Sequence, residues 1–189
     1  TNTPGSVLEE LCDERICFST GQRCGPDVSV LTTRLMMLYL LALEIGAATG
    51  SLHRHEVDEL GAAIGHLPDA AAQFLQDEDL NVSQIANALK DQQALMLVGG
   101  GANWFSAREG ALKVEEESSL LCKTYRPAEY LHNAIPLLSD QVATVSIAPP
   151  GKSYARLHDV VRTAQVARSP SLAVVVEGDE TLAADANFV

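Results

Sequence analysis

The second half of the chain alternates between apolar runs and helical spacing. Three runs, Ala94–Val98, Gln141–Ala148 and Leu172–Val176, are apolar over most of their length, and a segment near Tyr154–Val166 has helical spacing. Continuous apolar strands joined by helices are typical of a parallel sheet that is covered on both faces. The pattern therefore predicts an α/β fold, a three-layer sandwich with a parallel sheet between helices.

The first half of the chain is expected to be mostly helical. A long helix is expected to end near Gly46, and its leucines occupy most of its circumference, so protein should cover both of its sides. Helical spacing returns over Ser51–Leu89, with a break expected at Pro68. A short strand is expected at Arg15–Ser19. These helices would connect two regions that form sheet.

A charged face is the most distinctive feature of the stretch Ala102–Ser118, which follows the turn Gly99–Gly101 and is expected to be a helix. Glu109, Lys113 and Glu116 stand at positions i, i+4 and i+7, which fall within roughly 60° of one another on a helix. A carboxylate in this setting can act as a base, while the lysine keeps it ionised and stabilises a developing oxyanion. The same spacing is common on solvent-facing helices, so both interpretations stay open.

Two weaker candidates lie on either side of this face. Gly100 and Gly101 precede the helix and could hold a phosphate on backbone N–H groups, although a plain turn from strand to helix explains glycines there more often. His132 follows in the segment Ala128–His132 and is a candidate acid or base if it reaches the charged face. Lone histidines are otherwise mostly structural or exposed.

Composition and charge restrict the classes of partner. The chain has 189 residues, of which 47% are hydrophobic, enough for a real core. Its formal net charge is -12, with 13 Lys+Arg against 25 Asp+Glu, which argues against nucleic acid because phosphate backbones need a basic surface. An anionic substrate would need a local concentration of positive charge.

The cysteines and the apolar runs indicate where the protein resides. Cys12, Cys17, Cys24 and Cys122 lack metal-like spacing, so we expect reduced thiols in a cytoplasmic protein, with no metal and no cofactor. The apolar run Leu35–Leu43 is much shorter than the roughly 20 residues that cross a bilayer, so no membrane span is expected.

A resemblance to a known family is carried by Glu109–Ser118, Tyr125, Ala128–Glu129, His132 and the strand end Ala148–Pro149. These residues resemble the SIS (sugar isomerase) family, and within it the isomerase half of glucosamine-6-phosphate synthase and related phosphosugar isomerases and deglycases. The resemblance implies a flavodoxin-like topology and two pseudo-repeated units. Residues 1–50 would be the C-terminal part of the first unit, 51–93 a helical connector, and 94–189 a second unit that is truncated at its end.

The resemblance also implies roles for individual residues. Glu116 matches the base that moves a proton between C1 and C2 of an open-chain sugar phosphate, Lys113 the lysine near the sugar oxygens, and Glu109 a supporting carboxylate. His132 matches the ring-opening histidine, which in the family reaches the site of the partner subunit. Glu129 matches an acidic substrate-binding residue of the same motif.

The implied function is that of a phosphosugar-processing enzyme. It would isomerise a hexose 6-phosphate between aldose and ketose, or carry out a related amination, deamination or deglycation at C2 through a cis-enediol. A homodimer is implied as well. The alternative is a sugar-phosphate-sensing SIS module that binds its ligand without turnover. No helix-turn-helix region of the kind that often accompanies such regulators is visible in the sequence.

The sequence departs from the family pattern at three places. His132 is followed by Asn133–Pro136 where the family usually continues with Gly-Pro, and Leu131 stands where a lysine often precedes the histidine. The Ser/Thr-rich phosphate loop of the family would lie upstream of Thr1. We therefore expect the chain to be a fragment, with its first residues, Thr1–Asn2, forming the end of a strand.

Overall fold

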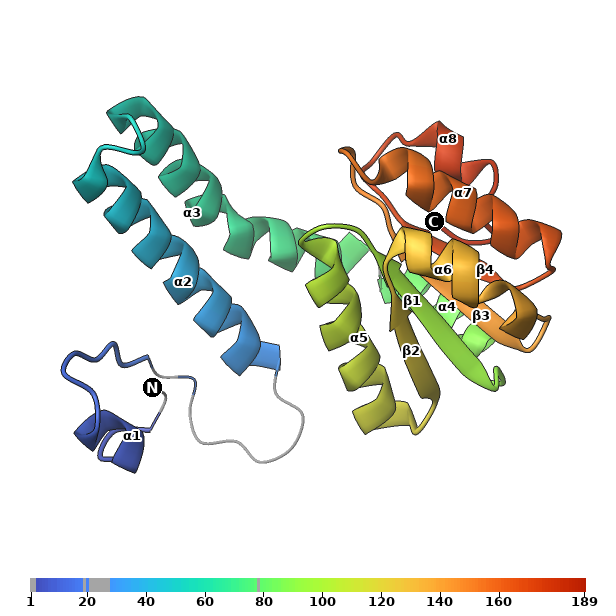
Figure 1. The fold of residues 1–189 in the computed structure, drawn as a ribbon, viewed down its shortest axis with the longest axis horizontal. Helices are drawn as coiled ribbons and strands as arrows, with labels where there is room; N and C mark the ends of the chain where they lie inside the picture. Colours follow the sequence, from blue (N-terminus) through green and yellow to red (C-terminus); the bar gives the residue numbers. More distant parts are fainter. Residues whose placement is uncertain (1–2, 19, 21–27, 78) are drawn as a thin grey trace. The chain divides into compact units, whose positions relative to one another are not determined.

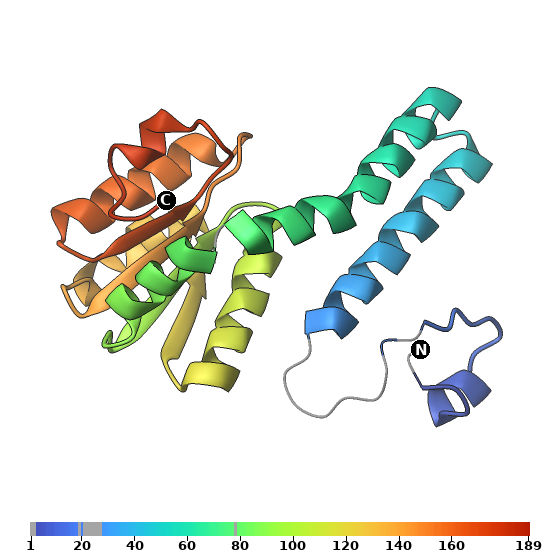
Figure 2. The same ribbon diagram turned by 180° about the vertical axis from the view of Figure 1, so that it is seen from behind.

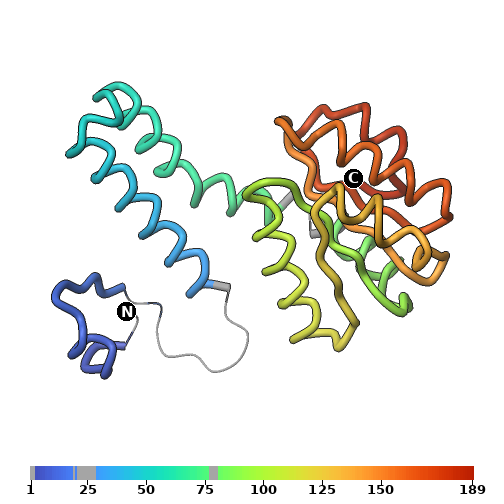
Figure 3. The backbone as a smooth tube through the Cα atoms, viewed as in Figure 1, coloured from blue at the N-terminus to red at the C-terminus, as the bar shows by residue number. Residues whose placement is uncertain are grey.

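The computed structural model describes residues 3–18, 20, 28–77 and 79–189 of the chain (Figures 1 and 3). Contacts between residues divide it into two compact units, Thr1–Asp79 and Leu80–Val189. The predicted strand end at Thr1–Asn2 lies outside the described residues. The predicted boundaries of the domains, 1–50, 51–93 and 94–189, remain a prediction.

The first unit is mostly helical over the residues that the structure describes. It contains α1 (Val7–Glu10), α2 (Val28–Thr49) and α3 (Arg54–Asp77), and α2 packs against α3. The helical prediction is therefore confirmed for this region. The predicted strand is wrong for the described residues Arg15–Phe18, which are irregular, because no neighbouring strand is present in the described part of this unit to pair with them. Ser19 lies outside the described residues.

The predicted break at Pro68 is also wrong, because α3 runs through it. Proline removes one backbone hydrogen bond from a helix interior but does not have to end the helix. The apolar residues Leu60, Ile64 and Leu67 before it and Phe74 after it keep helical spacing. The loss of one hydrogen bond is therefore absorbed within a long helix.

Helix α2 is longer and more exposed than expected. Its segment Ser29–Thr49 is apolar enough, and long enough, to cross a membrane by length and composition, which the short run Leu35–Leu43 had not indicated. Core helices of soluble proteins meet the same criteria, so this is weak support for a span. Leu38 and Tyr39 are each 61% exposed, so the described chain does not cover both sides of α2 as predicted.

The second unit is built on a parallel sheet of four strands in the order β2-β1-β3-β4. The strands are β1 (Ala94–Gly99), β2 (Leu121–Tyr125), β3 (Val142–Ile147) and β4 (Ser171–Val174). The α-helices are α4 (Asp79–Leu89), α5 (Asn103–Ser118), α6 (Pro127–Asn133), α7 (Tyr154–Val166) and α8 (Glu180–Ala183). A 3-10 turn, η1 (Ile135–Leu137), follows α6. The prediction of a parallel α/β sheet is confirmed.

The sheet separates two apolar clusters, which makes the unit a three-layer sandwich. Met96 and Val98 of β1 face the cluster formed with α6, α7 and α8, whereas Leu95 and Leu97 face the cluster formed with α4 and α5. Figure 1 looks onto the α6 and α7 layer, and the reverse view in Figure 2 looks onto the face that carries α4. Helices α5 and α6 therefore lie on opposite faces of the sheet.

The turn between β1 and α5 depends on a glycine. A Cβ on Gly99 would lie 2.1 Å from the backbone oxygen of Asn103, closer than any real contact. The first turn of α5 can approach the strand this closely only because position 99 has no side chain.

We expect Gly99→Ala to lower the free energy of unfolding by roughly 1–3 kcal/mol, because the added methyl group must displace the backbone of α5. Gly110→Ala in the same helix is the matched control, since its Cβ would lie 3.4 Å from Leu97 Cδ2 and alanine favours a helix by roughly 0.5–1 kcal/mol. Urea denaturation followed by circular dichroism compares the two. Equal stability of both variants would contradict the account of this turn.

Candidate functional site

Small residues set the distance between α5 and the sheet. Ala107 and Ala111 are buried in the cluster with Leu95 and Leu97, and the helix packs against β1 and β2 on this side. The charged residues of α5 occupy positions away from this buried side. Helix α5 thus has a packing face of small residues, and the charged face that the sequence predicts lies away from it.

Three charged side chains meet on α5 and are called the carboxylate–lysine group below. The Nζ atom of Lys113 lies 2.8 Å from Oε2 of Glu116 and 3.7 Å from Oε1 of Glu109. The exposed fractions of the side chains are 23% for Lys113, 32% for Glu109 and 35% for Glu116. Lys113 is therefore the centre of the group and the least accessible of the three.

The electrostatics of the group keep the lysine charged. The hydrogen bond with Glu116 raises the pKa of Lys113 above its ordinary value, and the negative charges of Glu116 and Glu109 act in the same direction. An ammonium group has three N–H donors, and the two carboxylates occupy at most two of them. A third donor is then free to bind the oxygen of a ligand beside the Glu116 carboxylate.

The neighbouring carboxylate of Glu115 has a different function. Its Oε1 accepts a hydrogen bond from the backbone N–H of Cys122 at 3.1 Å, which links the end of α5 to β2. Burial, together with the charge of Glu115, raises the pKa of the Cys122 thiol to about 11. Glu115 is thus a structural residue, and Cys122 stays a neutral thiol.

Glu129 takes part in the start of α6. Its Oε2 accepts from the backbone N–H of Arg126 at 3.0 Å, and its Oε1 lies 3.3 Å from Nη1 of the same arginine. The hydrogen bond from the Arg126 backbone lowers the pKa of Glu129. Pro127 at the first helical position completes a helix start that the sequence analysis overlooked. A substrate-binding role for Glu129 remains a prediction.

His132 stands apart from the carboxylate–lysine group. It lies in the last turn of α6 and is exposed. Among the described residues, no hydrogen bond or ion pair joins His132 or Glu129 to Glu109, Lys113 or Glu116, and α6 packs on the face of the sheet opposite to α5. The structure thus brings three of the predicted site residues together on one helix.

The two glycines that were candidates for a phosphate cradle have a packing explanation. A Cβ on Gly100 would lie 2.3 Å from the side chain of Ser153, and Gly101 has a left-handed φ of 59°. The backbone N–H groups of Asn103 and Trp104 donate to the carbonyl oxygens of Gly100 and Gly101 at 3.1 and 3.3 Å. These donors are consumed by the turn itself, and phosphate binding there remains a prediction.

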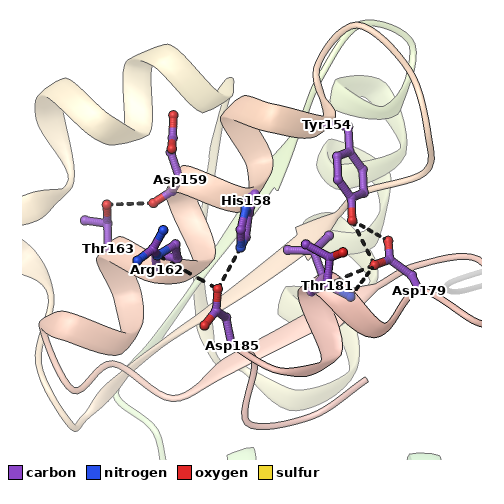
Figure 4. A network of polar contacts seen from close by, with 9 residues as sticks. Tyr154, His158, Asp159, Arg162, Thr163, Asp179, Thr181 and Asp185 are labelled. Atoms are coloured by element: carbon purple, nitrogen blue, oxygen red, sulfur yellow. Dashed lines mark hydrogen bonds and ion pairs between the residues drawn. The ribbon is translucent and has the colours of Figure 1, made fainter.

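A polar network on α7 and the segment that follows β4 escaped the sequence analysis (Figure 4). The Tyr154 hydroxyl donates to both carboxylate oxygens of Asp179 at 2.8 and 2.7 Å, and Nε2 of His158 lies 2.6 Å from Oδ2 of Asp185. The hydrogen bond from Tyr154 lowers the pKa of Asp179, which also caps α8. The spacing of Tyr154, His158 and Arg162 by four residues places them on one face of α7 and is the signal that could have revealed the network.

The network has a structural function that its contacts explain. Arg162 Nε lies 3.9 Å from Asp185, so two basic side chains of α7, His158 and Arg162, contact the segment that follows α8. These contacts hold this segment against α7. Among the described residues, no group of three or more His, Cys, Asp or Glu side chains could hold a metal ion.

Comparisons with known proteins agree with the three-layer α/β fold described above. No protein-family model matches the chain. It is 30% identical over 186 residues to glutamine–fructose-6-phosphate aminotransferase (isomerizing) from Gloeobacter violaceus, which covers 98% of this chain and 30% of that protein. The chain thus spans less than a third of the length of this curated relative.

Solved structures share the fold at low sequence identity. The C-terminal domain of glucosamine-fructose-6-phosphate aminotransferase from Francisella tularensis has a TM-score of 0.85 at 21% identity, covering 100% of this chain and 53% of that one. Tagatose-6-phosphate ketose/aldose isomerase from Escherichia coli has a TM-score of 0.51 at 18% identity, covering 62% and 34%. Sequence similarity along nearly the whole chain and the shared three-layer fold match the chain to the isomerase (SIS) domain of glucosamine-fructose-6-phosphate aminotransferase, in agreement with the resemblance seen in the sequence.

Proposed function

We propose that this chain supplies the proton-transfer residues of a phosphosugar-processing enzyme, which isomerises a hexose 6-phosphate or reacts at its C2 through a cis-enediol. The observation that carries the proposal is the carboxylate–lysine group, in which Lys113 lies against both Glu116 and Glu109. The relatives are named as an aminotransferase of fructose 6-phosphate and a tagatose-6-phosphate isomerase, which supports the substrate class.

The proposed reaction begins with an open-chain aldose phosphate whose carbonyl oxygen binds Lys113. The Glu116 carboxylate removes the proton at C2, the C–H electron pair forms the C1–C2 double bond, and the carbonyl electron pair moves to O1. The ammonium of Lys113 stabilises the resulting enediolate oxygen. Transfer of the O2 hydroxyl proton to O1 and return of the carbon proton to C1 give the ketose. Glu109 holds Lys113 in place.

Ring opening is assigned to His132. Because α5 and α6 pack on opposite faces of the sheet, a histidine on α6 and a base on α5 are more easily combined across two subunits than within one. This arrangement supports a homodimer in which His132 serves the partner subunit's site. We include the homodimer and a cytoplasmic location in the proposal.

The first prediction tests the base. The protein should exchange the C1 or C2 hydrogen of a hexose 6-phosphate in deuterated water, as followed by proton NMR. Glu116→Gln should abolish this exchange while leaving the dissociation constant within about tenfold of wild type, because it removes a group needed in the transition state. Glu117→Gln is the matched control and should retain exchange, since Glu117 is an exposed carboxylate outside the carboxylate–lysine group.

Two outcomes would count against this assignment. If the wild-type protein binds the sugar phosphate without any exchange, the sensing module becomes the better description of the chain. If Glu116→Gln and Glu117→Gln exchange at the same rate, the carboxylate–lysine group is a solvated ion-pair cluster without a role in catalysis.

The second prediction tests the shared site. Glu116→Gln and His132→Ala should each be inactive with a ring-closed substrate, whereas co-refolded mixtures should recover about a quarter of wild-type activity, since half of the random dimers carry one intact site. Size-exclusion chromatography with light scattering should detect the dimer. A mixture that stays inactive while forming dimers would show that both residues act within one subunit, and a His132→Ala variant that is active by itself would show that His132 has no role.

A further inference from the structure

Two arginines gather on one tryptophan in a chain that is otherwise strongly acidic. Arg126 Cζ lies 4.0 Å and Arg108 Cζ lies 5.1 Å from the ring centroid of Trp104. The formal net charge of the chain is -12, with only 13 Lys+Arg residues. Two guanidinium groups on one indole therefore form a local concentration of positive charge, here called the arginine–tryptophan cluster.

The positive charge of this cluster is only partly neutralised. Arg126 pairs with Glu129 at 3.3 Å, while Arg108 has the ring of Trp104 as its contact and no ion pair within the described residues. The side chains of Arg126 and Glu129 are 53% and 47% exposed, so water screens their interaction. The two guanidinium groups carry the same charge and contact the same ring, so an anion that binds both of them offsets their repulsion.

An unsatisfied donor belongs to the same cluster. Nε1 of Trp104 is buried and has no hydrogen-bond partner among the described residues. Buried indole N–H groups nearly always have an acceptor, and an indole can only donate. A ligand that supplies the missing acceptor would be bound by this N–H group together with the two guanidinium groups.

The position of the cluster in the fold also favours an anion. Trp104 lies in the first turn of the 16-residue helix α5, directly after β1, and Arg126 directly follows β2. The carboxyl ends of parallel strands are where ligands of open α/β sheets bind, and the start of a long helix carries a partial positive charge. The cluster therefore stands at an electropositive edge of the sheet.

An apolar surface adjoins the charged groups. Phe105 is 65% exposed, and its ring contacts that of Trp104 edge-on, with 5.0 Å between centroids. Inorganic phosphate has no group that could use this surface, whereas the carbon skeleton of a phosphate ester does. The N–H donors of a guanidinium group form a planar fork that matches the oxygen atoms of a phosphate dianion.

We propose that Arg108, Arg126 and Trp104 form a binding site for a phosphate monoester, separate from the carboxylate–lysine group. The site goes beyond the proposed catalytic function, because it needs none of the residues Glu109, Lys113 and Glu116. Arg108 and Arg126 bind the phosphate oxygens, the Trp104 N–H donates to one of them, and Phe105 contacts the organic part of the ester.

The test uses the fact that Trp104 is the single tryptophan of the chain, so its fluorescence reports on the cluster directly. Titration of the 189-residue chain with glucose 6-phosphate should change the fluorescence with saturation, inorganic phosphate should bind more weakly, and glucose should give no change. Raising the salt concentration should weaken the binding. No saturable change with glucose 6-phosphate up to millimolar concentration would overturn the proposal.

Substitutions make the test specific. Arg108→Gln and Arg126→Gln should each raise the dissociation constant by about tenfold or more, and Arg108→Lys should fall between Arg108→Gln and wild type. Arg156→Gln is the matched control, because it removes an exposed arginine of α7 that also pairs with a carboxylate three residues away, as Arg126 does. Thermal melting by circular dichroism checks that each variant folds. Equal weakening by Arg156→Gln, or none by Arg108→Gln and Arg126→Gln, would contradict the proposal.

The same titration separates this site from the catalytic proposal. Lys113→Ala removes the group that binds the sugar oxygen in the carboxylate–lysine group, and it should retain the fluorescence change at an unaltered dissociation constant even if it abolishes hydrogen exchange. A loss of the fluorescence change in Lys113→Ala would show that the phosphate ester binds at the carboxylate–lysine group and would overturn the assignment of a separate site.

Discussion

Burial of β1 on both of its faces is the constraint on which the second unit depends. Leu95 and Leu97 point to one face and Met96 and Val98 to the other, and all four are nearly inaccessible. At about 25 cal/mol per Å² of buried apolar surface, neither face can be left open to water. Helices must therefore cover both faces, and the chain meets this demand with α5 on one face and α6 on the other.

This arrangement decides how the candidate site can work. The carboxylate–lysine group lies on α5, on the side away from the sheet, while His132 belongs to a helix of the opposite layer. A reaction that needs a base and a ring-opening group at one substrate then requires residues that one copy of this unit does not bring together. The division into layers is a direct consequence of the fold and gives a physical reason for proposing a dimeric site.

The parts of the fold that were predicted correctly are those with strong local patterns. Continuous apolar runs predicted β1, β3 and β4, and helical spacing predicted α7 as Tyr154–Val166. The strand β2 was missed because its sequence, Leu121–Tyr125, mixes polar and apolar residues, as suits an edge strand whose first residue is 68% exposed. The break predicted at Pro68 was wrong because a long, packed helix can continue through a proline.

The candidate site was predictable only in part for similar reasons. The spacing of Glu109, Lys113 and Glu116 places them next to one another on one helix. Their ion pairs therefore follow from local structure. The contact of Arg126 with Trp104 and that of His158 with Asp185 join elements that are distant in sequence, so spacing along one helix does not specify these partners. Glu129 was predictable only in part. The family motif identified the residue, whereas the capping of α6 by its carboxylate was found only in the structure.

The most direct measurement is a crystal structure of the protein with a bound hexose 6-phosphate. The account predicts that Lys113 Nζ lies within hydrogen-bond distance, roughly 3 Å, of an oxygen on C1 or C2, with the Glu116 carboxylate equally close to the hydrogen-bearing carbon. A sugar phosphate bound elsewhere, with Glu109, Lys113 and Glu116 facing open solvent, would contradict the central claim that this group carries the chemistry.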